Sequence, residues 1–283
     1  MAGKLFLCAT PIGNLKDMTP RVIETLESVD VIAAEDTRNS IKLLNHFNIK
    51  TPMTSYHEYN KIEKAQHLVA QMQAGKNIAL ITDAGTPAIS DPGEVLVQKC
   101  YEAGIAVTSL PGAAACITAL TLSGLSTRRF SFEGFLSSEK KERKAVLEDL
   151  KEESRTIILY EAPHHLKGTL KELRDTLGNR KITLCRELTK KFETVFPTTL
   201  EEALEYYETN DPRGEYVLVL EGKSHKQKNE EKQALLSEMS IEEHMKLYED
   251  QGMDRKEAMK LVAKERGISK RDVYNYMLTL QDE

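Results

Sequence analysis

The chain has 283 residues, of which 40% are hydrophobic and 29% are charged, and its formal net charge is −5. It is longer than the roughly 100 to 200 residues of one ordinary domain, and no apolar run approaches the about 20 residues that span a bilayer. We therefore expect a cytoplasmic, globular protein of two domains with a small addition, no contact with a membrane, and affinity for nucleic acid only through a local basic patch.

The four cysteines are scattered along the chain at Cys8, Cys100, Cys116 and Cys185. Neither a CxxC pair nor a Cys/His pattern at metal-ligand spacing occurs among them. We expect reduced, mostly buried thiols and no metal site.

Strand-like apolar runs alternate with helical patterns in the first half of the chain. The runs lie at residues 4–10, 30–36, 78–85 and 105–112. Helices are expected from Thr19-Pro20, from about Arg38, after Asn60 and from Pro92. This alternation predicts βαβ units and a largely parallel sheet, here assigned to an N-terminal αβα domain at residues 1–118. Thr19 is a suitable cap for a helix that begins at Pro20, since proline has no N–H to satisfy.

A second set of strands follows a helix at residues 113–125. These strands are expected at 129–135, 155–162, 181–188, 193–199 and 215–222, with helices at about 140–153 and 164–177. The runs 181–188 and 193–199 are separated too briefly for a helical crossover, which predicts antiparallel pairing. The second αβα domain, with a mixed sheet, is assigned to residues 119–223.

Residues 224–283 are assigned to a linker and a small helical domain. The polar stretch 224–233 is typical of an exposed linker. Cap-competent side chains precede carboxylates by three residues at Ser240, Asp254 and Ser269, and the last two helices join at Gly267 with helix-turn-helix proportions. Basic side chains crowd this helix pair: Arg255, Lys256, Lys260, Lys264, Arg266, Lys270 and Arg271. Whether it contacts RNA, a protein or a second copy of the chain stays open.

Glycine- and proline-rich turns follow three of the expected strands. They contain Gly13, Gly85 and Gly112, each close to a proline. In a parallel sheet, ligands bind outside the carboxyl ends of the strands, where such turns expose backbone groups. One such turn alone would only reverse the chain. None fits GxGxxG or GxxxxGK[ST], so the three together predict a ligand without a pyrophosphate.

The sequence resembles a known enzyme family. The segments TPIGNLKD, AEDTRNSIKLL, TSYHEYN, LITDAGTPAISDPG, LPGAAA, FEGFL, YEAPHH, CRELTK and GEYVLVLEG follow one another over about residues 4–222. In this order they resemble the small-subunit ribosomal RNA (cytidine-2′-O)-methyltransferases of the tetrapyrrole-methylase superfamily, the class III methyltransferases. The helical tail is similar to the helix-turn-helix addition of some members.

The resemblance implies an α/β fold of two αβα domains, a homodimer, and S-adenosylmethionine bound between the domains. The implied reaction is 2′-O-methylation of a cytidine of 16S ribosomal RNA, at the decoding centre of the small subunit, with no role for DNA. The implied cofactor residues are Ile12, Gly13, Asp83, Gly85, Thr86, Pro87, Ile89, Ser90, Gly112, Ala114, Ala115, Tyr160, Glu161, Leu188 and Tyr216. Helix packing is an equal explanation for Ala114 and Ala115.

Methyl transfer to a hydroxyl is an in-line displacement in which the sulfonium loses its charge, so we expect neutral surroundings at the sulfur and a group that accepts the hydroxyl proton. Two polar clusters expected at strand ends supply candidates: Glu35, Asp36, Thr37 and Arg38 in the first, and His57, Glu58 and Asn60 in the second. The hypothesis assigns the proton to Asp36 or His57 and the RNA phosphates to Arg38 and Lys190. Asp36 could instead cap the following helix, and Lys190 could lie on a solvated face.

Two other interpretations remain. A tetrapyrrole C-methyltransferase would share the fold, but it has no evident use for a helix-turn-helix tail. A non-catalytic regulator would join a ligand-sensing module to a DNA reader, and the dense polar motifs at the strand ends argue against it.

Overall fold

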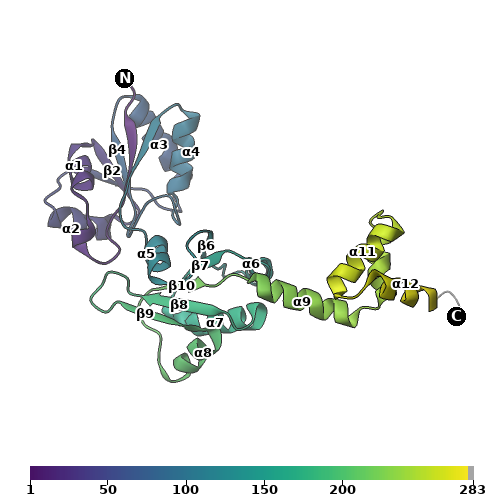
Figure 1. The fold of residues 1–283 in the computed structure, drawn as a ribbon. Helices are drawn as coiled ribbons and strands as arrows, with labels where there is room; N and C mark the ends of the chain where they lie inside the picture. The colour runs from purple at the N-terminus through teal and green to yellow at the C-terminus, as the bar shows by residue number, and fades with distance from the viewer. Residues whose placement is uncertain (280–283) are drawn as a thin grey trace. The chain divides into compact units, whose positions relative to one another are not determined.

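The computed structural model describes residues 1–279 (Figure 1). The chain divides into two compact units, the first formed by Met1–Gly222 and the second beginning at Lys223. The first unit contains two five-stranded sheets, and the second is helical. Among the described residues, no helix is both long and apolar enough to cross a membrane.

The first sheet has five parallel strands in the order β3-β2-β4-β1-β5. Its strands are β1 (Lys4–Cys8), β2 (Val31–Ala34), β3 (Met53–Ser55), β4 (Ile78–Ile81) and β5 (Ala106–Leu110). The connection after β1 leads toward β2, whereas the connection after β4 passes β1 to reach β5. The carboxyl ends of β1 and β4 therefore flank the point where the winding reverses, and ligands bind at such points.

Helices cover both faces of this sheet. They are α1 (Pro20–Ser28), α2 (Thr37–His46), α3 (Lys61–Gln73) and α4 (Gly93–Glu102), with a short 3-10 helix η1 (Leu15–Asp17) before them. Successive side chains of a strand point to opposite faces. Accordingly, Ile78 and Leu80 of β4 pack with α3 and α4, whereas Ala79 and Ile81 pack with α1 and α2. The expected helix start is confirmed, because Thr19 Oγ1 accepts a 3.3 Å hydrogen bond from Val22 N.

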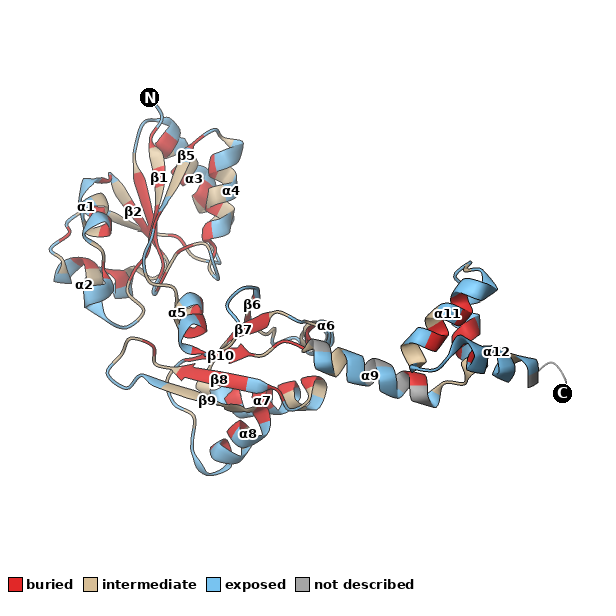
Figure 2. Cartoon of the chain, in the orientation of Figure 1, coloured by how far each residue is buried: buried red, intermediate tan, exposed pale blue. Residues whose placement is uncertain are grey.

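The second sheet is mixed, as predicted, in the order β6-β7-β10-β8-β9. Its strands are β6 (Phe130–Phe135), β7 (Thr156–Glu161), β8 (Lys181–Arg186), β9 (Thr194–Thr199) and β10 (Tyr216–Leu220). Only β6 and β7 run parallel among its described pairs, and the antiparallel pairing of β8 with β9 is confirmed. Figure 2 shows β10 buried along its length and β8 buried except at its ends.

Helices also cover both faces of the second sheet. They are α5 (Ala115–Leu122), α6 (Lys140–Lys151), α7 (Pro163–Leu177) and α8 (Leu200–Thr209). Ile157 and Leu159 of β7 pack with α6, α7 and α8, whereas Ile158 packs with α5. The face beside α5 is the one that takes part in the candidate site.

Sequence patterns missed one strand and one α-helix of the first unit, as well as the short 3-10 helix η1. Strand β3 has only three residues, too few to show an alternating pattern. Helix α8 begins directly after β9 with a capping box in which Thr199 and Glu202 bond reciprocally. Because Thr199 is also the last residue of β9, the helix start is hidden in the strand pattern. The expected domain boundary after residue 118 falls inside α5, whose buried side chains all pack with the second sheet.

The described part of the second unit, up to residue 279, forms four helices. They are α9 (His225–Glu238), α10 (Ile241–Glu249), α11 (Arg255–Arg266) and α12 (Lys270–Thr279). Met245 of α10, Val262 of α11 and Val273 of α12 are fully buried and form one small core. The predicted caps at Ser240, Asp254 and Ser269 are confirmed. The second unit therefore has an apolar core of its own.

The prediction of a linker over residues 224–233 is wrong in one respect, because this stretch forms most of helix α9. Ser224 and Gln227 form a reciprocal cap at its start, with Ser224 Oγ accepting from Gln227 N at 3.1 Å. Lys226 and Glu230 add an i,i+4 pair. Lys, Gln and Glu are good helix formers, so a polar stretch without glycine or proline stays helical.

Candidate functional site

Three turns meet at the carboxyl edge of the first sheet. Thr10 and Gly85 exchange backbone hydrogen bonds of 2.9 and 3.1 Å, which join the turn after β1 to the turn after β4. Thr86 Oγ1 donates a 2.9 Å hydrogen bond to the carbonyl of Ala113, which joins the latter turn to the one after β5. Gly85 has φ +87°, a conformation that costs a residue with a Cβ roughly 1–2 kcal/mol. The three glycine turns are therefore one structure.

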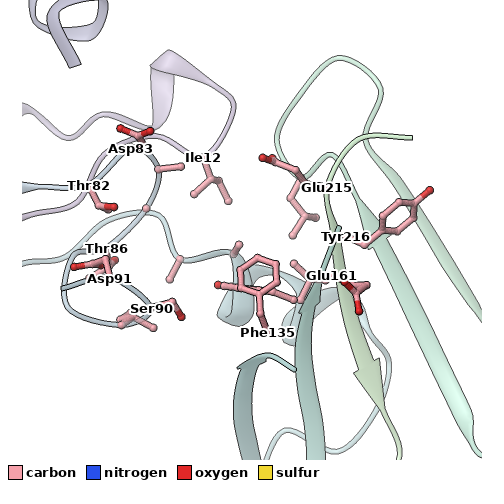
Figure 3. A pocket seen from close by; sticks show the side chains of 18 of the residues that line it. Ile12, Thr82, Asp83, Thr86, Ser90, Asp91, Phe135, Glu161, Glu215 and Tyr216 are labelled. Carbon is pink, nitrogen blue, oxygen red and sulfur yellow. The ribbon is translucent and has the colours of Figure 1, made fainter. Parts of the chain in front are cut away.

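A cavity of about 540 Å³ lies between these turns and the second sheet, within the range of about 300 to 1,000 Å³ typical of ligand sites (Figure 3). Its lining comes from both sheets of the first unit. The residues are Ile12, Glu35, Thr82, Asp83, Ala84, Gly85, Thr86, Ile89, Ser90, Asp91, Ala114, Ala115, Phe135, Tyr160, Glu161, Ala162, Pro163, Cys185, Leu188, Glu215, Tyr216 and Val217.

The structure brings together the implied cofactor residues except Gly13, Pro87 and Gly112, which do not line the cavity. Gly13 lies directly behind the lining. A Cβ there would lie 2.4 Å from Lys190 Cγ and 2.8 Å from the carbonyl oxygen of Leu188. Its absence lets the first turn contact the segment around Leu188, so Gly13 shapes the cavity without facing it.

Other lining residues were not singled out from the sequence. Thr82 and Asp91 stand inside the DAGTPAISDPG segment or beside it, so the turn itself was a usable signal. Glu215 and Cys185 belong to strands of the second sheet or their ends, and Phe135 ends β6. The sequence carries no signal for these three, because they reach the cavity only through packing of the two sheets.

The lining contains five carboxylates and, among the described lining residues, no cationic side chain. Three of them lie in the turn before α4 or at the second sheet, and each accepts hydrogen bonds from neighbouring groups. Asp91 accepts from the backbone N–H groups of Ala88 and Gly93, both at 2.8 Å, and so shapes the turn before α4. Glu161 accepts from Thr169 Oγ1, and Glu215 accepts from Lys190 Nζ.

The other two carboxylates, Glu35 and Asp83, follow adjacent strands. Ala34 of β2 pairs with Ile81 of β4, so Glu35 and Thr82, the residues directly after them, lie side by side. Glu35 Oε2 accepts a 2.5 Å hydrogen bond from Thr82 Oγ1. Asp83 Oδ2 accepts from Asn39 Nδ2 of α2 at 3.1 Å. The cavity as a whole is therefore acidic, which differs from the neutral surroundings that the sequence predicts for a sulfonium.

Aromatic side chains form the wall on the second sheet. The Tyr160 ring lies edge-on to Phe132 and Phe135, with centroids 5.0 and 5.5 Å apart. Its hydroxyl accepts a 3.1 Å hydrogen bond from Cys116 N of α5. Burial raises the pKa of the Tyr160 phenol far above its ordinary value, so this wall is neutral. Tyr216 points its ring away from the cavity (Figure 3), toward Tyr207 in the core.

The segment around Leu188 has an unusual backbone. Glu187 and Thr189 have φ of +53° and +61°, a left-handed conformation that a β-branched residue rarely adopts. Glu187 N donates to the carbonyl of Glu215 at 3.0 Å, and Thr189 N donates to Glu193 Oε2 at 2.6 Å. Strained backbone persists where surrounding contacts hold it, and such positions cluster at ligand sites.

Asp36 and Arg38 are two of the four catalytic candidates. They form an ion pair with each other, and neither lines the cavity. Asp36 caps α2 by accepting from Arg38 N at 2.8 Å, and both its oxygens also accept from the Arg38 guanidinium. These hydrogen bonds lower the pKa of Asp36 to about 2. Arg38 is 88% exposed. The capping alternative for Asp36 is therefore confirmed as a structural role.

His57 and Lys190, the other two candidates, also lie outside the lining. His57 follows β3, two strands from β4 and hence about 10 Å across the sheet, and its Nε2 lies 3.3 Å from Asn60 Nδ2. Lys190 Nζ donates to Glu187 at 2.9 Å and to Glu215 at 2.7 Å. Burial opposes the charge on Lys190, but these two hydrogen bonds prevail and raise its pKa.

Among the side chains that the structure describes, no cluster of three or more metal-ligating groups could hold a metal ion. All four cysteines are free and buried, as predicted.

Comparison with known proteins places the chain among methylases. The family model described as Tetrapyrrole (Corrin/Porphyrin) Methylases matches residues 4–204. Ribosomal RNA small subunit methyltransferase I from Synechocystis sp. is 49% identical over 280 residues, which cover 99% of both chains. The protein of the same name from Bacillus subtilis is 46% identical over 273 residues, covering 96% of this chain and 93% of its own.

Solved structures share the fold at much lower identity. Diphthine synthase has a TM-score of 0.63 at 14% identity and covers 81% of this chain and 94% of its own. Uroporphyrin-III C-methyltransferase from Thermus thermophilus, complexed with S-adenyl homocysteine, has a TM-score of 0.55 at 17% identity, covering 77% and 97% of the two chains. These likenesses show two α/β sheets of the same type.

Proposed function

Because the chain belongs to the tetrapyrrole methylase family, we propose that it transfers a methyl group from S-adenosylmethionine to the 2′-oxygen of a cytidine in 16S ribosomal RNA. The near full-length similarity to proteins named ribosomal RNA small subunit methyltransferase I supports the RNA substrate. The target lies in the small subunit at the decoding centre, and the enzyme works in the cytoplasm as a homodimer.

The acidic cavity is the observation that carries the cofactor assignment. S-adenosylmethionine has a sulfonium, an ammonium and one carboxylate, so its net charge is positive. A lining of five carboxylates without a cation among its described residues favours such a ligand over a dinucleotide or a nucleoside triphosphate. The cavity also has the volume of a ligand site, and backbone turns form much of it.

The proposed cofactor residues act by shape and position. S-adenosylmethionine, when bound, supplies the electrophilic methyl carbon. The turns at Gly85 and Ala114 present backbone groups, Tyr160 closes the opposite wall, and Leu188 is fixed by its strained flanking residues. A wall fixed in this way aligns reacting atoms and excludes water, which supplies much of the rate of an in-line displacement.

The reaction also needs a group that accepts the proton of the ribose hydroxyl. Asp36 and His57 remain candidates, but Asp36 is ion-paired and neither residue lines the cavity. Glu35, directly before Asp36 in the sequence, lines the cavity, and among the described interactions only its Oε2 atom accepts hydrogen bonds. The geometry therefore favours Glu35, another member of the first polar cluster, for this role. Arg38 and Lys190 remain the proposed phosphate contacts beside the cavity.

A single-turnover assay tests these assignments. Purified protein with saturating S-adenosylmethionine is mixed with small ribosomal subunits from cells that lack the gene. Loss of a proton acceptor lowers the transfer rate by about 10² to 10⁴. We expect that loss for Glu35→Gln and a much smaller one for Asp36→Ala and His57→Ala. A wild-type rate for Glu35→Gln would remove this residue from the mechanism.

Mass spectrometry of 16S ribosomal RNA tests the reaction itself. We expect one cytidine to lose its 2′-O-methyl group in cells without the gene and to regain it when the gene is restored. Identical ribose methylation in both strains would overturn the proposal. A tetrapyrrole C-methyltransferase, the second candidate from the fold, would instead leave the RNA unchanged and methylate a porphyrinoid acid.

A further inference from the structure

One face of α12 is exposed and chemically distinct. Lys270, Arg271, Tyr274 and Asn275 lie within an arc of about 140° on one side of this helix, because successive residues are turned by about 100°. All four are exposed, and the Tyr274 side chain is 51% exposed. Figure 2 shows how little of α12 is buried.

The fold of the second unit fixes the direction of this face. Gly267, with φ +65°, ends α11 in a left-handed turn, and Ser269 caps α12 by accepting from Asp272 N at 3.1 Å. Val273, on the opposite side of α12, is fully buried with Met245 and Val262. The exposed face therefore points outward from a core that holds α12 rigidly.

Charge is unevenly distributed within the second unit, because cations outnumber carboxylates on α11 and α12 even though Glu257 and Asp272 are also exposed there. Exposed cations lie on α11 and α12 at Lys260, Lys264, Lys270 and Arg271. Carboxylates concentrate on α10 and just after it, at Glu242, Glu243, Glu249 and Asp250. Within the described part of the chain, no ion pair engages the four cations. Because the whole chain has a net charge of −5, this pair of helices is a local basic surface on an acidic protein.

We propose that the exposed face of α12, together with Lys260 and Lys264 of α11, is an RNA-binding surface. Lysine and arginine contact phosphates, an exposed tyrosine stacks on an unpaired base, and asparagine can bond a base edge. A face that combines these three groups matches a folded RNA with accessible bases. The identity of that RNA as 16S ribosomal RNA rests on the proposed function.

Binding of the full chain to 16S ribosomal RNA transcribed in vitro tests the surface. Filter binding is measured at several salt concentrations for wild type, for Lys270→Ala with Arg271→Ala, and for Tyr274→Ala. Removing two phosphate contacts is expected to reduce the slope of log affinity against log salt by about 1.4 to 1.8. Loss of one stacked base is expected to raise Kd by about fivefold to 100-fold.

A matched variant controls for the loss of charge alone. Lys226→Ala with Lys246→Ala removes two exposed lysines from α9 and α10 and should bind RNA like wild type. Circular dichroism monitors folding, and alanine at the first turn of α12 suits a helix. Unchanged RNA affinity and salt slope in the α12 variants, or an equal loss in the control pair, would overturn the inference.

Duplex DNA of equal length separates RNA recognition from the properties of a DNA reader. Equal affinity for both nucleic acids, lost for both in the α12 variants, would show that the surface is wrongly assigned to RNA. Weaker RNA binding by the α12 variants in a protein that does not methylate small-subunit RNA would leave the surface standing and remove only the proposed reaction.

Discussion

Thr10 and Gly85, which are 75 residues apart in the sequence, exchange both backbone hydrogen bonds across the carboxyl edge of the first sheet. Their pairing extends the contact between β1 and β4 beyond the end of the strands. It holds the turn that carries Ile12 against the turn that carries Thr86, and both residues line the cavity. The shape of this wall therefore depends on Gly85 keeping its left-handed conformation.

Gly85→Ala is expected to weaken cofactor binding. A Cβ at this position would be strained by the φ of +87° and would lie 3.3 Å from Ile12 Cγ2. We expect a fall of about 1–2 kcal/mol in the free energy of unfolding and a Kd for S-adenosylmethionine that is about tenfold higher, measured by denaturant titration and calorimetry.

Gly104→Ala is the control for this substitution. Gly104 also has a positive φ, of +68°, but a Cβ there would meet nothing within 4 Å. It should lose similar stability and bind the cofactor like wild type. A similar loss of affinity in both variants would mean that reduced stability, and not the cavity wall, causes the effect.

Asp36→Asn should reveal a stability contribution that depends on pH. The pKa of Asp36 is lowered to about 2 from its ordinary 3.8, so the charged carboxylate stabilises the fold above about pH 4. That contribution is lost as the pH falls from about 4 to about 2. Asparagine is an equally good helix cap, so the substitution removes mainly the ion pair with Arg38.

Thermal unfolding at pH 7, 5, 4 and 3 measures this contribution. The Tm of Asp36→Asn should lie below that of wild type at pH 7, and the difference should shrink below pH 4. Asp211→Asn, which removes the 3.6 Å pair of an 86% exposed carboxylate with Lys167, serves as the comparison. A Tm difference that stays constant down to pH 3 would contradict the assignment.

Much of the fold was predictable from local signals. Thr19-Pro20 marks a helix start, and the short connection between β8 and β9 determines antiparallel pairing. These signals are local, so one sequence contains them. Helix α9 was not predicted, because polarity without glycine or proline is compatible with both a solvated helix and a linker. Strand β3 was too short to be recognised by periodicity.

The candidate site was predictable only where residues of one turn act together. The residues around Gly85 were found, since the turn that contains them is continuous in sequence. Phe135 and Glu215 reach the cavity through packing of the second sheet against the turns, which no local pattern encodes. The pairing of Asp36 with Arg38 depends on side-chain geometry, so charge alone made Asp36 look available for catalysis.

Tyr160→Phe is expected to retain most cofactor binding. The substitution keeps the edge-on ring contacts with Phe132 and Phe135 and removes only the acceptor for Cys116 N. An unsatisfied backbone N–H costs about 1–3 kcal/mol of stability. Because the phenol stays neutral, the pH dependence of methyl transfer should be unchanged.

Tyr160→Ala is the contrasting variant. It removes the ring that closes the cavity wall and should raise the Kd for S-adenosylmethionine by at least about tenfold, or about 1.4 kcal/mol. Calorimetry on both variants provides the comparison. Equal affinities for Tyr160→Phe and Tyr160→Ala would show that the ring does not contact the cofactor.

Comparing the alkylation rates of Cys185 and Cys100 can locate the cofactor without any substitution. Both thiols are fully buried, and burial raises the pKa of each to about 11. Only about one thiol in a thousand would then be ionised at pH 8, so alkylation should be slow in the folded protein and rapid after unfolding, because the thiolate is the reactive form.

The two cysteines differ in their position relative to the cavity. Cys185 lines it, whereas Cys100 belongs to α4 and packs against the first sheet. S-adenosylhomocysteine should therefore slow alkylation of Cys185 more than that of Cys100, as measured by mass spectrometry of labelled peptides over time. Ligand binding that stabilises the whole first unit would slow both sites equally, so only a difference between them places the ligand in this cavity. Unchanged labelling of Cys185 at saturating ligand would mean that the cofactor binds elsewhere.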